Sequence, residues 1–331
     1  MRFLTFYILY LIYINQKKDI DLQNRNVINI IKDITFSEKN KYDYTVAEND
    51  FKSYIVNFIK ILEDNFDYET LSHLYNNISS LDIKVSLLSN KNILNKIIAP
   101  NVLATYSPGK NKIVFNGKSN VNNSIYHELF HMATSFKIKE VIFVGFSQQF
   151  MKGNNIEGYG VGFNEGYTDL LANRYFNKII SYDIEAEIAE QIENIVGRKV
   201  MEKLYLKADL KSLISELSKY SSLEEINDFI NNVDMICLNK YINKNKVLMN
   251  LTANKILGFM YNIFMNRYKE DIERDKIYDK TLTKKLIEAQ LKYLAILFKK
   301  YGINCWNLNE IETINKEKIK KLNNVKLVSF Y

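Results

Sequence analysis

Two of the three histidines in this 331-residue chain, His127 and His131, lie four residues apart in the segment Ser-Ile-Tyr-His-Glu-Leu-Phe-His (124–131). On a helix, residues i and i+4 lie one above the other, so both imidazoles can reach a single ion. Glu128 lies beside them, close to a water on that ion. This HExxH spacing is what a catalytic Zn2+ requires of one helix, with the glutamate as general base. The ordinary alternative is an amphipathic helix whose histidines face solvent or satisfy a hydrogen bond. With histidine so scarce, chance gives the pattern in roughly one such chain in six hundred, so we favour zinc.

A catalytic zinc usually has three protein ligands and one open position, so a third ligand is expected elsewhere in the chain. Downstream, the segment Gly-Phe-Asn-Glu-Gly-Tyr-Thr-Asp (162–169) begins a run with helical spacing, for which Asn164 is a plausible N-cap. Glu165 and Asp169 then share one helix face. Glu165 can be the third ligand, and Asp169 can accept the free N–H of a zinc-bound imidazole and so fix its tautomer.

Two alternatives to this assignment stay open. The acidic residues could simply form a first turn that complements the helix dipole. Glu157, in a glycine-rich loop expected at 153–162, is the rival ligand, although no predicted helix holds it and no acidic residue follows four positions later.

The pair of motifs HELFH and NEGYTD resembles the gluzincin branch of zinc metallopeptidases. In the thermolysin-like members, HExxH is followed by an Asn-Glu-x-x-Ser/Thr-Asp helix that supplies the third ligand. The resemblance covers about residues 100–180 and implies a zincin-like core, a Zn2+ cofactor and hydrolysis of peptide bonds in a peptide or protein substrate. It implies that the metal ligands are His127, His131 and Glu165. It also implies that Glu128 is the general base and that Asp169 is the hydrogen-bond partner of a ligand histidine.

One departure from the thermolysin-like pattern is the 33-residue stretch between His131 and Glu165, which is longer than in those enzymes. The insert 132–163 carries an expected hairpin and the glycine-rich loop, and could form a lid. Substrate specificity is therefore not transferred.

In the mechanism that this resemblance implies, Glu128 takes a proton as a zinc-bound water attacks a peptide carbonyl, then passes it to the leaving amine. A side chain should also stabilise the oxyanion. The only other histidine, His73, lies on a predicted helix well before the site, where a surface or capping role is favoured. A tyrosine is therefore the expected donor, either near in sequence or distant: Tyr159, Tyr167, Tyr241 or Tyr261.

Two further functions compete with a general peptidase. The chain could be a non-catalytic zincin-like binding or regulatory protein with a structural or vestigial metal site. It could also be a proteolytic regulator that cuts one specific intracellular partner with the same residues.

The elements that must position these residues follow from apolar periodicity. Helices are predicted near 51–62 and 69–79, and a strand near 83–88. Short β-prone runs at 102–106 and 112–115 flank Pro108-Gly109, which suits the centre of a type II turn, so a hairpin is expected. The second strand of this hairpin could offer a free edge to an extended peptide.

The C-terminal half is predicted to be mainly helical. A strand pair is expected within 141–150, and the pattern is helical from Asn164 almost to the end. The segments 254–268 and 282–299 are apolar on most faces and should form buried helices.

The fold class expected from these elements is α+β: a zincin-like catalytic core with a small mixed sheet and an active-site helix, followed by a mainly helical C-terminal half. We divide the chain into an N-terminal α+β region, the core and a helical region that could be continuous with the core: 1–98, 99–205 and 206–331.

Composition supports a globular protein with a buried core, since 47% of the residues are hydrophobic and 25% are charged. The net charge of +7 is modest and dispersed, so no nucleic-acid partner is expected. Cys237 and Cys305 lie in no metal-binding pattern, and two free thiols are favoured over a disulfide.

The apolar stretch 3–14 is too short for a transmembrane helix, which needs about 20 residues. It suits either a buried strand or an export signal or anchor, so membrane association stays open. A cytoplasmic location is slightly favoured over export or anchoring.

Overall fold

A computed structural model of the chain describes residues 35–36, 48–78, 80–86, 103–116, 121–152, 155–240, 245–273, 280–305 and 310. The chain divides into two compact units, unit 1 up to Ala133 and unit 2 from Thr134, each treated below by itself. The described residues form a mixed α+β structure in which helices predominate, as the sequence predicts. The three regions expected from the sequence stay a prediction, and the apolar stretch 3–14 lies outside the described residues.

Unit 1 contains a mixed four-stranded sheet in the order β1-β2-β4-β3. Its strands are β1 (Thr35–Phe36), β2 (Asp82–Ser86), β3 (Ala104–Ser107) and β4 (Lys112–Asn116). Strand β2 is parallel to both β1 and β4, whereas β3 is antiparallel to β4. The predicted hairpin is thus confirmed, but its second strand is not a free edge. Because β4 pairs on both sides, the hairpin strand at an edge is β3, and β1 forms the other edge among the described strands.

The turn of this hairpin differs from the expected type II turn. Residues Pro108–Lys110 form a short 3-10 helix, and the left-handed residue is Asn111 (φ 44°), not Gly109. Asparagine tolerates this conformation because its short side chain can hydrogen-bond locally. The Asn111 amide donates to the carbonyl of Asn77 and accepts from the Tyr106 hydroxyl, which ties the turn to a neighbouring helix.

The helices of unit 1 are α2 (Glu48–Asn65), α3 (Ser72–Ile78) and α5 (Val121–Thr134), whose last residue begins unit 2. Both helices predicted before residue 80 are therefore confirmed, each with shifted ends. Their apolar faces and the sheet form a core whose members are almost wholly buried: Phe51, Ile55, Phe58, Leu62, Leu74, Ile83, Ile113 and Phe115.

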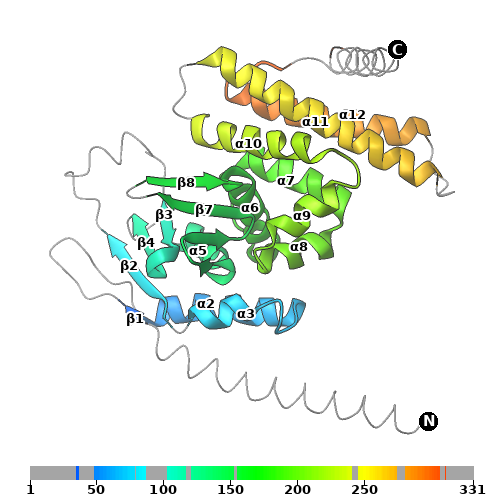
Figure 1. Cartoon of the computed structure of the whole chain (residues 1–331). Coiled ribbons are helices and arrows are strands. Elements are labelled where there is room, and N and C mark those ends of the chain that lie inside the picture. Colours follow the sequence, from blue (N-terminus) through cyan, green and yellow to red (C-terminus); the bar gives the residue numbers. More distant parts are fainter. Residues whose placement is uncertain are drawn as a thin grey trace, which may run out of the picture. The chain divides into compact units, whose positions relative to one another are not determined.

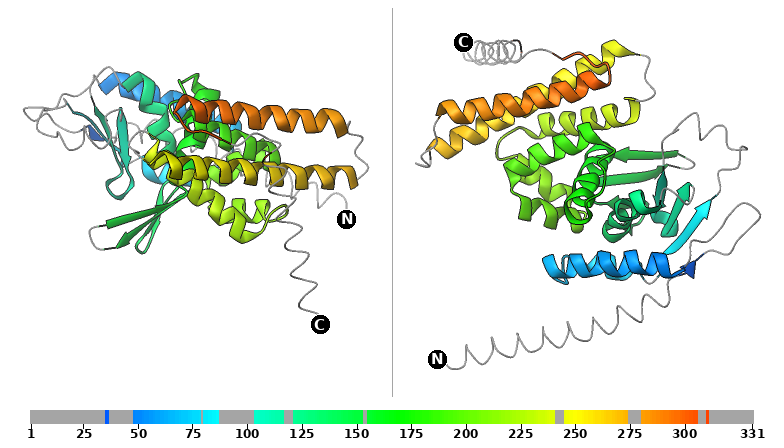
Figure 2. Two further views of the ribbon diagram at one scale, coloured as in Figure 1. Left: turned by 90° about the horizontal axis from the view of Figure 1, so that it is seen from above. Right: turned by 180° about the vertical axis from the view of Figure 1, so that it is seen from behind.

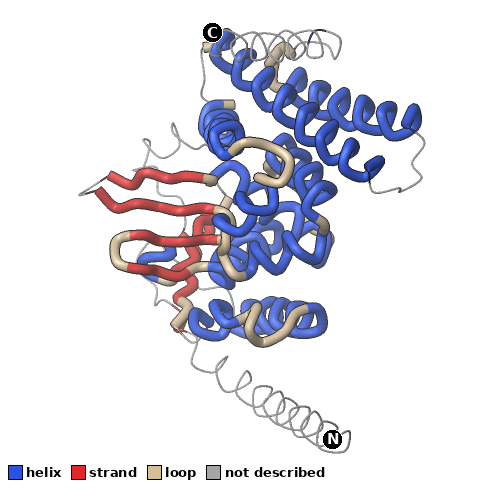
Figure 3. Tube along the Cα trace, turned by 45° about the vertical axis from the view of Figure 1, so that its right-hand side comes forward, coloured by secondary structure: helices blue, strands red, loops and turns tan. Residues whose placement is uncertain are grey.

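Unit 2 begins with an antiparallel meander, β5-β6-β7-β8, whose strands are joined in sequence order (Figure 3). Its strands are β5 (Phe136–Ile138), β6 (Val141–Val144), β7 (Ser147–Lys152) and β8 (Asn155–Tyr159). The strand pair predicted within 141–150 is confirmed as β6 and β7. The glycine-rich segment is not a loop throughout, because β8 pairs with β7 along five residues and this pairing outweighs local propensity.

The remainder of the described chain in unit 2 is helical (Figure 1). Its helices are α6 (Val161–Phe176), α7 (Asp183–Val196), α8 (Arg198–Leu206), α9 (Leu210–Leu217), α10 (Leu223–Asn239), α11 (Lys246–Glu273) and α12 (Lys280–Lys300). The two long helices α11 and α12 lie side by side in both views of Figure 2 and contain the predicted helical segments 254–268 and 282–299. Segment 254–268 of α11 is buried or half-buried except at Lys255 and Asn266, which confirms the predicted buried helix. Helix α12 instead buries one apolar stripe and exposes the opposite face, including Tyr293 and Ile296. Among the described helices, none is both long and apolar enough to cross a bilayer.

Candidate metal centre

Helix α5 carries the HExxH segment and is held in unit 1 by two apolar faces. The first is an apolar stripe whose members are at most 5% exposed: Val121, Ile125, Leu129 and Met132. The second consists of Tyr126 and Phe130, which pack on Phe58 of α2 with ring centroids 6.4 and 5.0 Å from it. Asn57 of α2 also donates to the Tyr126 hydroxyl at 2.9 Å. Burial on both faces fixes the rotation of α5 about its axis.

The two histidines lie on a third side of α5, which neither of these apolar faces occupies. Their Nε2 atoms are 2.9 Å apart, and the rings are edge to face with centroids 4.6 Å apart. Two imidazoles bound to one tetrahedral zinc at about 2.0–2.1 Å would have nitrogens about 3.3 Å apart. The pair is thus already arranged for a shared ion. His131 is 7% exposed, and His127 is more open.

Glu165 completes a group of three potential ligands, whose ligand atoms all lie within 4.8 Å of one another. Its carboxylate is partly buried, as is His127. Two imidazole nitrogens and one carboxylate oxygen form a donor set typical of a catalytic zinc with an open position, so the residues present fit this metal. Glu128, the predicted general base, follows His127 directly and is 6% exposed.

Helix α6, which carries Glu165, begins differently from the prediction. The N-cap is Gly160 in a left-handed conformation (φ 78°), not Asn164, which lies inside the first turn and donates its N–H to the Gly160 carbonyl. Gly160 has no side chain with which to cap the helix. Instead, Asp234 of α10 accepts from the N–H groups of Gly160 and Gly162 at 2.8 and 2.7 Å.

Asn164 is buried and forms a hydrogen bond to the turn between β6 and β7 of unit 2. Its Oδ1 accepts from the N–H of Phe146 at 2.9 Å, which joins α6 to the turn between β6 and β7. In that turn, a Cβ on Gly145 (φ 51°) would lie 2.2 Å from Asn164 Oδ1 and 2.4 Å from the Tyr205 ring. A residue without a Cβ is required there, because both the conformation and the space exclude one.

Tyr205 of α8 is a fully buried hydroxyl close to the same part of α6. The Tyr205 hydroxyl oxygen lies 2.6 Å from Thr168 Oγ1. The Thr168 hydroxyl in turn donates to the carbonyl oxygen of Asn164. Burial raises the pKa of Tyr205 well above 10.0, and the nearby charge of Glu165 acts in the same direction. Tyr205 is therefore a neutral hydrogen-bonding group at neutral pH.

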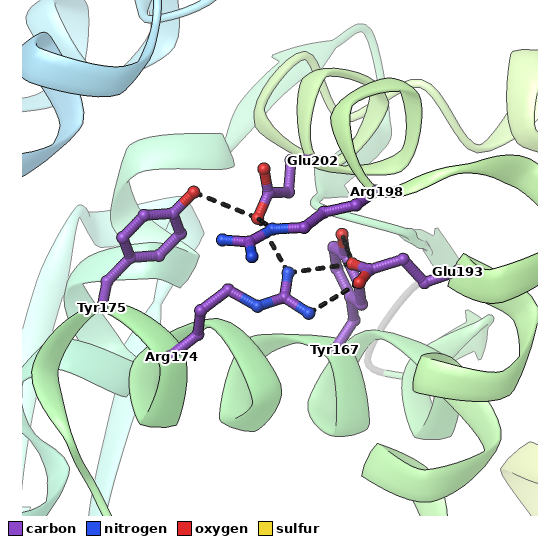
Figure 4. Close-up of polar contacts among 6 residues, drawn as sticks. All are labelled: Tyr167, Arg174, Tyr175, Glu193, Arg198 and Glu202. Atoms are coloured by element: carbon purple, nitrogen blue, oxygen red, sulfur yellow. Dashed lines mark hydrogen bonds and ion pairs between the residues drawn. The ribbon is translucent and has the colours of Figure 1, made fainter.

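The C-terminal end of α6 is anchored by the buried ionic network in Figure 4. Arg174 donates to both carboxylate oxygens of Glu193 on α7, at 2.6 and 2.9 Å, and to Glu202 on α8 at 2.7 Å. The Tyr167 hydroxyl donates to Glu193 at 2.7 Å, and burial together with that carboxylate raises its pKa well above 10.0. Because the charges are paired and hydrogen-bonded, the network can stay ionised away from water.

Asp169 lies one helical turn after Glu165, as predicted. Its Oδ2 accepts from the backbone N–H groups of Ser181 and Tyr182 at 2.6 and 2.8 Å, in the segment before α7. One carboxylate oxygen thus holds the α6–α7 connection. The role predicted for Asp169, as acceptor of an imidazole N–H, stays a prediction.

The other residues considered from the sequence lie elsewhere. Glu157 is exposed on β8, His73 lies on α3, and neither belongs to the group of three. Tyr159 donates to Asn227 of α10 at 2.7 Å, and burial, with a smaller effect of Asp234, raises its pKa to about 12.

The remaining tyrosines do not identify an oxyanion donor. Tyr167 is 0% exposed and donates to Glu193. Tyr261 lies on α11, and Tyr241 lies outside the described residues. The donor is therefore unassigned.

The two cysteines are free thiols, as favoured from the sequence. Burial raises the pKa of Cys305 to about 12 and that of Cys237 further. Neither belongs to the group of three potential ligands found among the described residues.

Asp234 and Tyr205 are two of the residues around α6 that the sequence analysis did not identify. Tyr205 is one of 23 tyrosines, and Asp234 lies mid-helix in a segment with ordinary amphipathic spacing. A weak signal existed for Asp234, because an acidic residue facing the apolar side of a helix usually has a buried partner.

No protein-family model, curated protein or solved structure matches the chain. The assignment of function therefore depends on the residues and their geometry.

Proposed function

We propose that this protein is a zinc-dependent metallopeptidase of the gluzincin type with a zincin-like core. The observation that carries the proposal is the meeting of His127, His131 and Glu165 within 4.8 Å, since these are the three residues that the two motifs nominate independently of the structure. Two further features support it: the 2.9 Å approach of the two Nε2 atoms and the position of Glu128 between the histidines in sequence.

The division of labour in this proposal follows from the side chains. The three ligands would hold Zn2+, which supplies a Lewis acid able to acidify a coordinated water and polarise a carbonyl. Glu128 would accept the proton of the attacking water and return it to the leaving amine. Its side chain is 6% exposed, and Glu128 directly follows the ligand candidate His127 in the chain.

Strand β3 (Ala104–Ser107) is the proposed guide for an extended peptide. Within the part of unit 1 that is described, β3 pairs only with β4 and so has one unpaired edge. An extended substrate can add to such an edge through backbone hydrogen bonds. This replaces the earlier expectation that β4 provides the edge.

The test combines metal content with hydrolysis. The purified chain should contain about one equivalent of zinc by elemental analysis and should cleave an unfolded protein substrate. Glu128→Gln should keep the zinc and lower the rate by about 10^2–10^4-fold, the usual contribution of a positioned general base. His127→Ala should lose both the zinc and the activity.

A matched control is Glu140→Gln, at an exposed position in the turn between β5 and β6, which should leave zinc content and rate unchanged. An inactive wild type that retains zinc would instead favour the non-catalytic binding protein. A wild type with well under one equivalent of zinc would overturn the metal assignment itself.

A further inference from the structure

Helix α6 must hold Glu165 in place, yet its N-terminus lacks a cap of its own. Gly160 turns the chain from β8 into the helix and offers no side-chain acceptor. An α-helix leaves its first four N–H groups without partners inside the helix. Ordinarily, an Asp, Asn, Ser or Thr at the N-cap accepts from one of them. Here the acceptor comes from another helix.

Asp234 of α10 supplies that acceptor with both oxygens. Oδ2 accepts from the Gly160 N–H and Oδ1 from the Gly162 N–H, and the side chain is 8% exposed. The contact is also close between the helix backbones. A Cβ on Gly162 would lie 2.7 Å from the carbonyl oxygen of Val233 and 2.8 Å from Cys237 Cβ. The first turn of α6 is therefore held against α10 by the carboxylate of Asp234, and Gly162 allows the two helix backbones to come this close.

The helix that carries Asp234 is itself fixed at its C-terminus. Lys240, the C-cap of α10, forms an ion pair with Glu185 of α7 at 2.5 Å, and neither side chain is exposed. Glu185 also touches α6, since a Cβ on Gly166 would lie 2.3 Å from its carbonyl oxygen. Helices α10, α7 and α6 thus make a closed set of contacts on both sides of Glu165.

Glu165 depends on this arrangement through helix geometry. In an α-helix the N–H of residue 165 bonds to the carbonyl of residue 161, so Glu165 belongs to the first complete turn. If that turn frays, the backbone of Glu165 loses its fixed direction. Gly162, which Asp234 holds, is only three residues earlier, at about 4.5 Å along the axis.

From these contacts we propose that Asp234 is a positioning residue of the metal centre: by holding the first turn of α6 it aims Glu165 at the ion. The inference rests on the proposed metal site, but not on peptide hydrolysis. Groups that hydrogen-bond directly to metal ligands commonly alter metal affinity by about 10–100-fold when they are replaced, and Asp234, which acts through the helix backbone, should fall at the lower end of that range.

The substitution Asp234→Asn tests this in the full-length chain. The amide oxygen can accept from only one of the two N–H groups, and the amide nitrogen faces the other. We expect the dissociation constant for zinc, measured by competition with a chromophoric chelator, to rise about 10-fold. Hydrogen exchange at residues 160–165 of the zinc-free variant should become faster, while exchange in α10 stays slow.

The matched control is Asp209→Asn. Asp209 caps α9 in the same unit and accepts from the Ser212 N–H at 2.9 Å, but α9 carries none of the proposed ligands. It should leave the zinc affinity within about twofold of wild type, and thermal stability close to wild type, because Asn caps a helix about as well as Asp. If Asp234→Asn and Asp209→Asn bind zinc equally well, Asp234 is merely structural and the proposal is overturned.

A second measurement needs no variant and covers the case in which Asp234→Asn fails to fold. In the zinc-free wild type, the amides of Gly160 and Gly162 should exchange as slowly as those in the middle of α6. Fast exchange at both would show that Asp234 does not hold this turn, and would overturn the proposal. A wild type that binds no zinc would overturn it as well. Absence of hydrolysis with zinc bound would refute only the peptidase activity.

Discussion

Helices α5 and α6 carry the three potential ligands of the candidate centre, but different kinds of contact hold them. Helix α5 is fixed by apolar side chains, such as Ile125 and Leu129, and by aromatic contacts with α2. Helix α5 also buries polar groups, such as Ser124 and Glu128. Helix α6 differs because its buried polar groups form hydrogen bonds that join it to other parts of unit 2, as those of Asn164 and Asp169 do.

The two kinds of packing respond differently to change. Apolar burial is graded, because each lost methylene removes a small amount of stability. Buried polar groups respond sharply, because the loss of one partner leaves another charge or donor uncompensated. We therefore expect truncations at the apolar positions of α5 to lower stability in small steps, and the loss of a buried polar partner of α6 to lower it sharply.

The largest expected effect is at the C-terminal end of α6. Arg174→Met leaves the carboxylates of Glu193 and Glu202, which are 6% and 5% exposed, without their shared cation. The free energy of unfolding, measured by urea denaturation, should fall by about 3–5 kcal/mol.

Arg198→Met is the matched control, because Arg198 also bonds to Glu202 but is 54% exposed. Its effect should stay within about 1 kcal/mol. Equal effects of the two substitutions would contradict the distinction between buried and exposed partners.

The next effect is a pH dependence at the N-terminal end of α6. Burial raises the pKa of Asp234 from 3.8 to about 6, in spite of the two N–H groups that lower it. The folded state thus favours the protonated form. The resulting stability is fully present below about pH 4 and is lost as the pH rises through about 6. The shift corresponds to about 3 kcal/mol.

The measurement is urea unfolding of the zinc-free wild type and of Asp234→Asn between pH 4 and 7.5, with a chelator present. Other titrating groups cancel in the difference between the two proteins. As the pH rises from 4 to 7.5, the free energy of unfolding of the wild type should fall by up to about 3 kcal/mol relative to that of the variant. A constant difference would show that Asp234 titrates normally.

The smallest expected effect belongs to α5. Ile125→Val removes one methylene from a side chain that is 0% exposed, and should cost about 0.5–1.5 kcal/mol. The same change at Ile179, which is 75% exposed, should be close to neutral. A cost at Ile125 as large as that of Arg174→Met would remove the contrast between the two helices.

Sequence reasoning succeeded where the signal was local. The helix from Val121, the hairpin and the strand pair in 141–150 follow from spacings within a few residues. The grouping of His127 and His131 with Glu165 could be anticipated because each motif carries its own helical register.

It failed where partners distant in sequence decide the structure. Asn164 resembles an N-cap, but Asp234, 70 residues later, takes that role and releases Asn164 to bind Phe146. The 112–115 strand resembles an edge, but pairing with β2, 30 residues earlier, places it inside the sheet. Tyr167 was considered as an oxyanion donor, and its carboxylate partner lies 26 residues further along.

The meander between the two ligand helices has a consequence for folding kinetics. Its strands pair with their immediate neighbours, and Val144 faces Ser147 only three residues away, whereas β1 and β2 join Thr35 to Asp82. Local contacts form early, because little chain entropy is lost in closing a short loop. The 33 residues between His131 and Glu165 should thus condense as successive hairpins before the parallel pairing in unit 1 is complete. The proposed ligand Glu165 would then follow His131 after a segment built mainly of paired strands, and not after a long loop.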